Sequence, residues 1–339
     1  MDIRKTLELL TGVAGVSGAE SEASRTALEL LSEYAPGAQC DAFGNVTALI
    51  PAQDASAPTL MLDAHIDQIG FIVSYIDPDG FLKVGACGGP DMRIMLAQSV
   101  TVHGVQDIRG VVSTLPPHVS SDHTKVPEAG EIAIDIGMTR EEAEKAVPLG
   151  SRVTVDSDFL ELSDGVISAP SVDDRSGVCA VLCALDMLRG RKLRYNLAVC
   201  FSAQEETGER GVKGAAFRLQ PDEAIAVDVS FGRTPDSGPH ETAVLGSGAM
   251  IGYSAALDRG MSDALKSAAE KNGIPYTIEV MPSSTGTNAD SISISRAGVK
   301  CCTVSIPIRY MHTPIETVRL SDIESAARLI CEYAAGGKN

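Results

Sequence analysis

Residues 172–206 have the sequence VDDRSGVCAVLCALDMLRGRKLRYNLAVCFSAQEE. The first half, 172–188, predicts a helix, and 195–202 is an apolar run of strand length without strict polar alternation, which predicts a buried strand. The acidic pair Glu205-Glu206 follows that strand directly. A helix that leads into a buried strand is the repeating unit of α/β proteins, so this stretch indicates an α/β fold.

The same alternation continues on both sides of this stretch. We predict a mainly central, mixed sheet covered by helices on both faces, which is a three-layer α/β arrangement. The expected helices are 1–10, 21–34, 212–218, 261–271, 289–297 and 320–333, and the expected strands are 45–50, 59–62, 224–229 and 300–305.

Residues 68–164 have a different character. Short apolar runs are separated by Gly and Pro turns, with one convincing helix at 139–146, which is typical of a small β-rich, barrel-like unit. We therefore predict a discontinuous α/β domain, formed by residues 1–67 and 165–339, with the β-rich domain 68–164 inserted in it.

Composition excludes several classes of function. The chain has 339 residues and a formal charge of −17, from 45 acidic and 28 basic residues. Such a surface repels phosphate backbones and anionic membranes, so neither nucleic acid nor a membrane is an expected partner. The first ten residues do not resemble a signal peptide, and we expect a cytoplasmic protein. Cysteines such as Cys179, Cys183 and Cys200 lie in apolar segments and are expected to be buried thiols.

Histidine and acidic residues gather where the predicted strands end. Because open α/β sheets place ligand sites at the carboxyl ends of their strands, we expect these side chains to share one crevice. Each has an ordinary explanation by itself; acidic pairs, for example, are common at helix starts, where they interact favourably with the helix dipole. The residues are His65, Asp67, Asp173, Asp174, Glu205, Glu206, Asp228 and His312.

These residue types suit a divalent metal. Imidazole and carboxylate together favour zinc, cobalt or manganese over calcium and magnesium, which prefer oxygen ligands alone. A single catalytic zinc takes about three protein ligands, so the number of candidates fits two ions that share a carboxylate. One remaining carboxylate would be available to transfer protons.

Several segments, in this order, resemble the dinuclear metallo-aminopeptidases that include the tetrahedral, glutamyl and deblocking aminopeptidases. The resemblance covers nearly the whole chain. It rests on residues 63–70 (DAHIDQIG), 171–177 (SVDDRSG), 204–208 (QEETG), 228–230 (DVS) and 309–314 (RYMHTP).

The resemblance implies a role for each residue. His65 and Asp228 would bind one metal ion, Glu206 and His312 the other, and Asp173 would bridge them. Glu205 would be the general base, and Asp67 would orient the His65 ring. The resemblance also implies a cis peptide after Asp173, peptide substrates, two divalent ions per subunit (zinc or cobalt, with manganese accepted) and a homo-oligomer, either a dodecamer or a smaller assembly. Residues 1–67 and 165–339 would form the metallopeptidase catalytic domain, and 68–164 a lid or oligomerisation domain.

Two segments, 231–240 and 283–290, depart from the family pattern, which leaves the preferred N-terminal residue open. Two other functions also remain open at this point. One is a different metal-dependent hydrolase, such as a glucanase or another amidase, and the other is a non-catalytic scaffold on the same fold.

Overall fold

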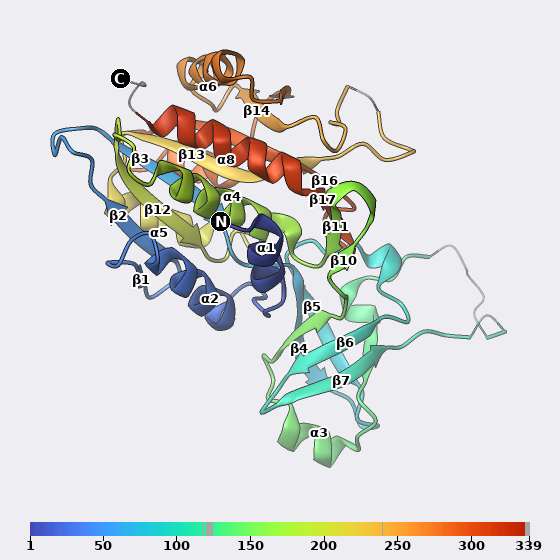
Figure 1. Cartoon of the computed structure of the whole chain (residues 1–339). Helices are drawn as coiled ribbons and strands as arrows, with labels where there is room; N and C mark the ends of the chain where they lie inside the picture. Colours follow the sequence, from blue (N-terminus) through green and yellow to red (C-terminus); the bar gives the residue numbers. More distant parts are fainter. Residues whose placement is uncertain (117, 120–124, 239, 336–339) are drawn as a thin grey trace.

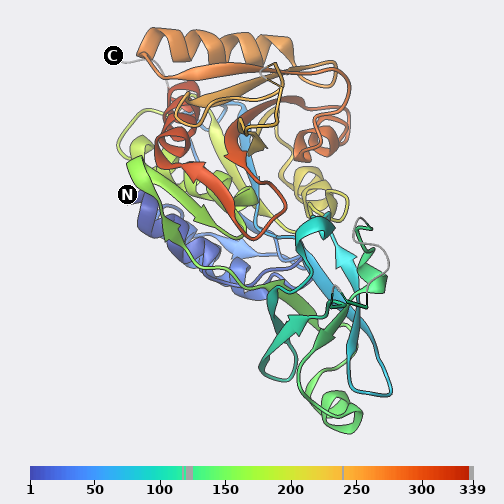
Figure 2. The same ribbon diagram turned by 90° about the vertical axis from the view of Figure 1, so that its right-hand side faces the viewer.

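The computed structural model describes residues 1–116, 118–119, 125–238 and 240–335 (Figure 1). Figure 2 shows a layered α/β unit at one end of the molecule and a small barrel at the other. This arrangement confirms the predicted fold class. Pro239, inside the unusual segment 231–240, and residues 336–339 lie outside the described residues. The exact domain boundaries at residues 68 and 164 stay a prediction.

The α/β unit is built on one mixed sheet. Strands β3, β12, β13 and β16 run parallel to one another in its centre, and antiparallel strands flank them. The strand order is β1 (Gln39–Cys40), β2 (Val46–Ile50), β12 (Asn196–Ser202), β3 (Thr59–His65), β13 (Glu223–Phe231), β16 (Lys300–Arg309), β17 (Glu316–Arg319), β11 (Val166–Ala169) and β10 (Leu160–Glu161). Off this path, β14 (Ala249–Ser254) pairs with β16, and β15 (Tyr276–Met281) pairs with β14.

Helices cover both faces of this sheet because successive strand residues point to opposite sides. Leu60 and Leu62 of β3 pack into one core, whereas Met61 between them packs into another. The first core includes residues of α1 (Ile3–Thr11), α2 (Ser21–Ser32), α4 (Val172–Leu188), α6 (Arg259–Asn272) and α8 (Leu320–Ala334). The second includes residues of α5 (Arg210–Leu219) and α7 (Asn288–Ser293).

The inserted segment forms a closed barrel with its own apolar core. Its strands, in order around the barrel, are β4 (Gly70–Ile76), β5 (Leu82–Cys87), β8 (Ala133–Asp135), β7 (Asp107–Val112), β6 (Ser99–His103) and β9 (Arg152–Val155). The predicted helix at 139–146 is α3 (Arg140–Ala146), and it begins at a capping box formed by Thr139 and Glu142.

Several predicted boundaries are wrong; strands β3 and β16, for example, continue to His65 and Arg309 instead of ending at residues 62 and 305. Helix α7 ends at Ser293 rather than at residue 297, because Arg296 has a positive φ of 55° that a continuing α-helix excludes. Strand β13 continues beyond Asp228 to Phe231, because the long strand β16 offers it pairing partners as far as Ile308. Asp228 is therefore inside a strand rather than at its end.

None of the helices among the described residues combines the length and the apolar character that a membrane span requires. Cys179, Cys183 and Cys200 are buried free thiols, as predicted.

Candidate metal centre

The parallel strands bring the predicted site residues to one edge of the sheet. His65 is the last residue of β3, Glu205 and Glu206 follow β12, and His312 follows β16. Asp173 lies at the start of α4, where the Asp173–Asp174 peptide bond is cis. These positions surround the carboxyl ends of the central strands, which is the usual place for a ligand site in such sheets.

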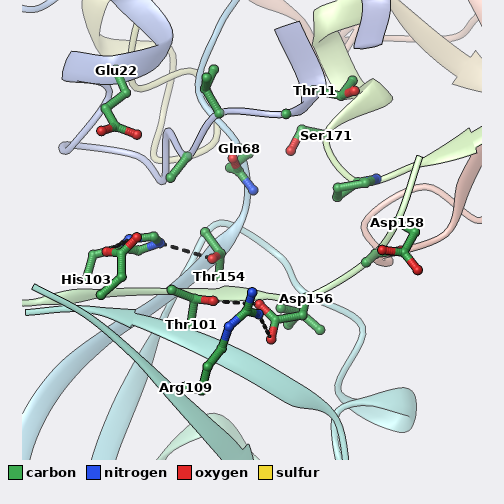
Figure 3. A pocket seen from close by; sticks show the side chains of 17 residues that line it. Thr11, Glu22, Gln68, Thr101, His103, Arg109, Thr154, Asp156, Asp158 and Ser171 are labelled. Carbon is green, nitrogen blue, oxygen red and sulfur yellow. Dashed lines mark hydrogen bonds and ion pairs between the residues drawn. The ribbon is translucent and has the colours of Figure 1, made fainter. Parts of the chain in front are cut away.

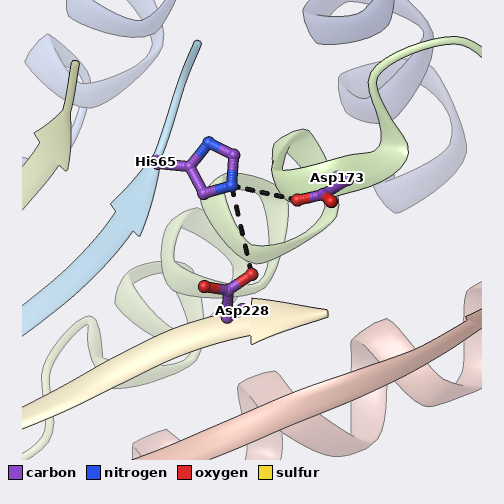
Figure 4. Close-up of side chains that lie close together, drawn as sticks. All are labelled: His65, Asp173 and Asp228. Atoms are coloured by element: carbon purple, nitrogen blue, oxygen red, sulfur yellow. Dashed lines mark hydrogen bonds and ion pairs between the residues drawn. The ribbon is translucent and has the colours of Figure 1, made fainter. Parts of the chain in front are cut away.

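A first group of possible ligands consists of His65, Asp173 and Asp228, all buried. The His65 Nε2 atom lies 2.9 Å from Oδ1 of Asp173 and 4.0 Å from Oδ1 of Asp228 (Figure 4). Each residue offers one ligand atom, and these atoms lie within 4.8 Å of one another. One imidazole and two carboxylates at this spacing can hold a divalent ion.

A second group consists of Asp173, Glu206 and His312. The His312 Nε2 atom lies 3.4 Å from Oδ2 of Asp173 and 3.5 Å from Oε1 of Glu206. Asp173 therefore turns Oδ1 toward the first group and Oδ2 toward the second. The two groups share this one carboxylate.

Backbone carbonyls fix both imidazole rings. The Nδ1 atom of His65 lies 3.1 Å from the carbonyl oxygen of Asp67, and that of His312 lies 2.9 Å from the carbonyl oxygen of Gly89. Because a carbonyl oxygen only accepts, each Nδ1 must be the donor, and loss of the proton that Nε2 shares with Asp173 would direct the Nε2 lone pair toward the carboxylates. This is the tautomer that a metal ligand needs.

The barrel connection closes one side of the site. Gly88 and Gly89 follow β5, and a Cβ atom on Gly88 would lie 2.8 Å from Oε2 of Glu206. With a φ of +73°, Gly88 also has a backbone conformation that favours glycine. The inserted segment thus contacts the predicted ligands directly.

The Asp67 carboxylate holds the turn that carries Glu205 and Glu206. It accepts the backbone N–H of Glu205 at 2.9 Å and that of Glu206 at 3.2 Å, and it also accepts the hydroxyl of Ser17. Its Oδ1 atom lies 3.5 Å from Nδ1 of His65, so it is close to the ring as well. Asp67 is fully buried.

Sequence reasoning missed Glu316 and did not recognise the role of Asp174. Glu316 is buried and accepts the backbone N–H groups of Asp173 at 2.9 Å and of His312 at 2.8 Å. Asp174 accepts the N–H of His65 at 3.2 Å. The available signal for Glu316 was an acidic residue opening a short β run, 316–319, just after the Thr-Pro turn.

Crowded carboxylates make the site electrostatically suited to cations. Burial raises the pKa of Glu205 to about 7 and that of Glu206 to about 8, and the negative charge of Asp173 adds to both shifts. The hydrogen bond with Asp173 raises the pKa of His312 to about 9. Buried carboxylates at such density need compensating positive charge. Two divalent ions would supply it, so the donor set fits metal.

A cavity of about 380 Å³ opens in front of both ligand groups. Glu205 lines it without belonging to either group. Both unusual segments contribute to its wall, the first through Phe231 and the second through Thr285, Gly286 and Thr287.

A different cavity, of about 320 Å³, lies between the N-terminal residues 11–14 and the barrel (Figure 3). None of the predicted ligands lines it. Four of its titratable groups pair with one another, because His103 lies 2.8 Å from Asp107 and Arg109 lies 2.5 Å from Asp156, while Glu22 and Asp158 also line it. Among the described residues that line this cavity, no group of ligands is therefore poised for a metal.

The chain matches the family model described as M42 glutamyl aminopeptidase over residues 44–329. It is similar to a putative aminopeptidase of Acetivibrio thermocellus, with 35% identity over 335 residues that cover 98% of each chain. It is also similar to the lysyl aminopeptidase of Pyrococcus furiosus, with 33% identity over 322 residues that cover 93% of this chain and 92% of the relative.

Solved structures show the same likeness. The aminopeptidase APDkam598 from the archaeon Desulfurococcus kamchatkensis has a TM-score of 0.92 and 33% identity, covering 98% of this chain and 94% of that one. The TET1 peptidase of Pyrococcus horikoshii has a TM-score of 0.85 and 29% identity, covering 98% and 99%. That peptidase is described as assembling into a tetrahedron or a large octahedral shell.

Proposed function

The chain belongs to the M42 glutamyl aminopeptidase family, as the sequence motifs predict, and we propose that it is a dinuclear metallo-aminopeptidase that removes N-terminal residues from peptides. Peptidases of this family depend on a metal. The observation that supports two ions most directly is the pair of ligand groups sharing Asp173, one oxygen toward each.

In this proposal each ligand group holds one divalent ion. His65 and Asp228 hold the first, Glu206 and His312 hold the second, and Asp173 bridges them. Zinc and cobalt are the expected metals, and manganese accepts the same ligands. When bound, the ions would polarise the scissile carbonyl and make water more acidic.

Glu205 is the proposed general base. Its carboxylate lines the cavity beside both ligand groups, so it can take a proton from the attacking water and return one to the leaving amine. Asp67 contributes indirectly, because its carboxylate accepts the backbone N–H groups of Glu205 and Glu206 and so holds both residues in place. It also lies next to the His65 ring.

A homo-oligomer is included in the proposal. It is supported by the similarity to the TET1 peptidase, which can assemble into a tetrahedron or a large octahedral shell. The preferred N-terminal residue does not follow from the comparisons, since the relatives of this chain include both a lysyl and a glutamyl aminopeptidase.

Hydrolysis of a panel of aminoacyl-p-nitroanilides tests the proposal. Each substrate is assayed with the protein as purified, after chelation, and after zinc, cobalt or manganese is added back, and bound metal is measured in parallel. We expect turnover that disappears on chelation and returns with metal. A glucan substrate serves as the comparison, because most glycosidases use two carboxylates without a metal. Bound metal without peptidase turnover would favour another hydrolase, and no bound metal would favour a scaffold.

A further inference from the structure

Glu279 is a half-buried acidic residue in the wall of the cavity that contains the metal centre. It lies on β15, where Glu279 and Met281 face the cavity while Ile278 and Val280 are exposed. Its carboxylate accepts the hydroxyl of Ser305 at 2.9 Å and also accepts the hydroxyl of Ser230. Neither the ligand groups nor the proton transfer uses this residue.

The sheet register places Glu279 close to the proposed metal ligand Asp228. Ser230 and Asp228 are two residues apart on β13 and so share a face, and Ser305 of β16 is the direct register partner of Asp228. Two residues along a strand span roughly 6.6–6.8 Å. The Glu279 carboxylate accepts the hydroxyl groups of both serines and therefore lies close to Asp228, on the same face of the sheet.

The wall near Glu279 combines apolar surface with uncompensated negative charge. Phe231, Met281 and Met311 line the cavity, and none of its described lining residues is a lysine or arginine. Glu279 is in none of the ion pairs found among the described residues. Two divalent ions would offset the carboxylates around them, which leaves Glu209 and Glu279 as the remaining acidic groups of the cavity.

We propose that Glu279 selects substrates whose N-terminal residue carries a cationic side chain, lysine or arginine. This inference rests on the proposed aminopeptidase function. The apolar walls would contact the side-chain stem, and the ammonium or guanidinium group would reach the carboxylate at the end of the cavity. An ionised carboxylate has about four acceptor sites, so two serine hydroxyls leave room for a cation. Burial raises the pKa of Glu279, which is the expected behaviour of a carboxylate that lacks a cationic neighbour.

The test compares Lys-, Arg-, Leu- and Glu-p-nitroanilide with the wild type and the Glu279→Gln variant, both loaded with metal. We expect the wild type to have its highest kcat/KM with Lys or Arg. In the Glu279→Gln variant, the ratio of kcat/KM for Lys-p-nitroanilide to that for Leu-p-nitroanilide should fall by roughly 10- to 150-fold. This is the factor that corresponds to the usual free energy of a hydrogen bond to a charged group. Glu29→Gln is the matched control, because Glu29 of α2 is an exposed acid that lines neither this cavity nor the adjoining one, and its ratio should not change.

Binding provides a second readout that does not depend on turnover. Calorimetry with metal-loaded protein compares lysine with norleucine, which has the same four-carbon stem without the ammonium group. We expect wild type to bind lysine more tightly and Glu279→Gln to lose that preference. An unfolding curve for Glu279→Gln shows whether the variant is folded.

The outcomes separate the two proposals. If no substrate is cleaved, the aminopeptidase function fails, while the lysine and norleucine affinities still decide the role of Glu279. An equal loss for all substrates in Glu279→Gln would mean that the residue binds the common α-amino group or supports the fold. That result, or a wild-type preference for Glu or Leu, would overturn the proposed selection.

Discussion

The carboxylate of Asp67 accepts the backbone N–H groups of Glu205 and Glu206 in succession, at 2.9 and 3.2 Å. One buried side chain from the end of β3 thereby fixes the loop that follows the neighbouring strand β12. The two residues on that loop have different proposed tasks, proton transfer for Glu205 and metal binding for Glu206. The position of one relative to the other thus depends on a residue that the proposal does not place on either metal.

Replacing Asp67 by Asn should therefore lower turnover without emptying the site. The amide keeps one acceptor oxygen but presents an N–H group to a backbone donor. We expect kcat to fall about 10- to 100-fold, the usual effect of losing a residue that supports metal ligands. Steady-state kinetics and metal content measure this. Ser17→Ala, which removes a different partner of Asp67, should have a smaller effect, and full activity in Asp67→Asn would contradict the assigned role.

Glu205→Gln separates the general base from the ligands. Because Glu205 belongs to neither ligand group, the variant should keep both metal ions and lose kcat by about 10²- to 10⁴-fold. Metal analysis beside single-substrate kinetics tests this. The comparison variant is Glu206→Gln, which should lose metal. If Glu205→Gln lost metal instead, the base and the ligand would have to be exchanged in the proposal.

Glu316 should prove as important for metal affinity as a ligand. Replacing it by Ala leaves the buried N–H group of Asp173 and the half-buried N–H group of His312 without an acceptor, and the buried group alone should cost about 1–3 kcal/mol in the free energy of unfolding. We also expect metal affinity to fall about 10- to 100-fold. Denaturant unfolding and metal titration measure the two effects. Glu324→Ala, on the exposed side of α8, is the control.

The preference for a lysyl substrate should depend on pH. Glu279 binds a cation only when deprotonated, and burial raises its pKa above that of an exposed glutamate, although the two serine hydroxyls partly oppose the shift. As pH falls through this raised pKa, the carboxylate gains a proton and the Lys:Leu ratio of kcat/KM should fall toward that of Glu279→Gln.

A ratio is used because other groups line the same cavity: His65, Asp173, Glu205, Glu206, Glu209, Asp228 and His312, with His240 and Glu241 in the neighbouring one. Their titration should affect both substrates alike. A ratio that stays constant in the wild type from acid to neutral pH would contradict the role of Glu279.

The sequence predicted those site residues that follow strong apolar runs. His65 and Glu205-Glu206 were located because β3 and β12 are buried strands, which have an unmistakable pattern. Glu316 and Glu279 were not located because β17 and β15 were not predicted. Both are short strands with an acidic residue in them, and β15 turns its polar side inward, opposite to the usual alternation.

Side-chain contacts between distant segments could not be predicted either. The resemblance implied that Asp67 orients the His65 ring, and the Asp67 carboxylate lies 3.5 Å from Nδ1 of His65. The hydrogen bonds of Asp67 to the backbone of residues 205 and 206 could not be predicted, because they depend on how two loops meet in space. The contact of Gly89 with His312 depends likewise on where the barrel connection lies.

The pairing of β3 with β12 has a consequence for how the protein is made. During synthesis the ribosome completes His65 long before it reaches β12 and β13, the parallel neighbours of β3, because the whole barrel is translated in between. The barrel strands lie in one uninterrupted segment and can close first, whereas the sheet that carries the ligands must wait for distant partners. His312, the last of the proposed ligands along the chain, follows all of these strands. A nascent chain that stops before His312 would thus hold no complete set of proposed ligands, and the proposed peptidase activity would require synthesis beyond that residue.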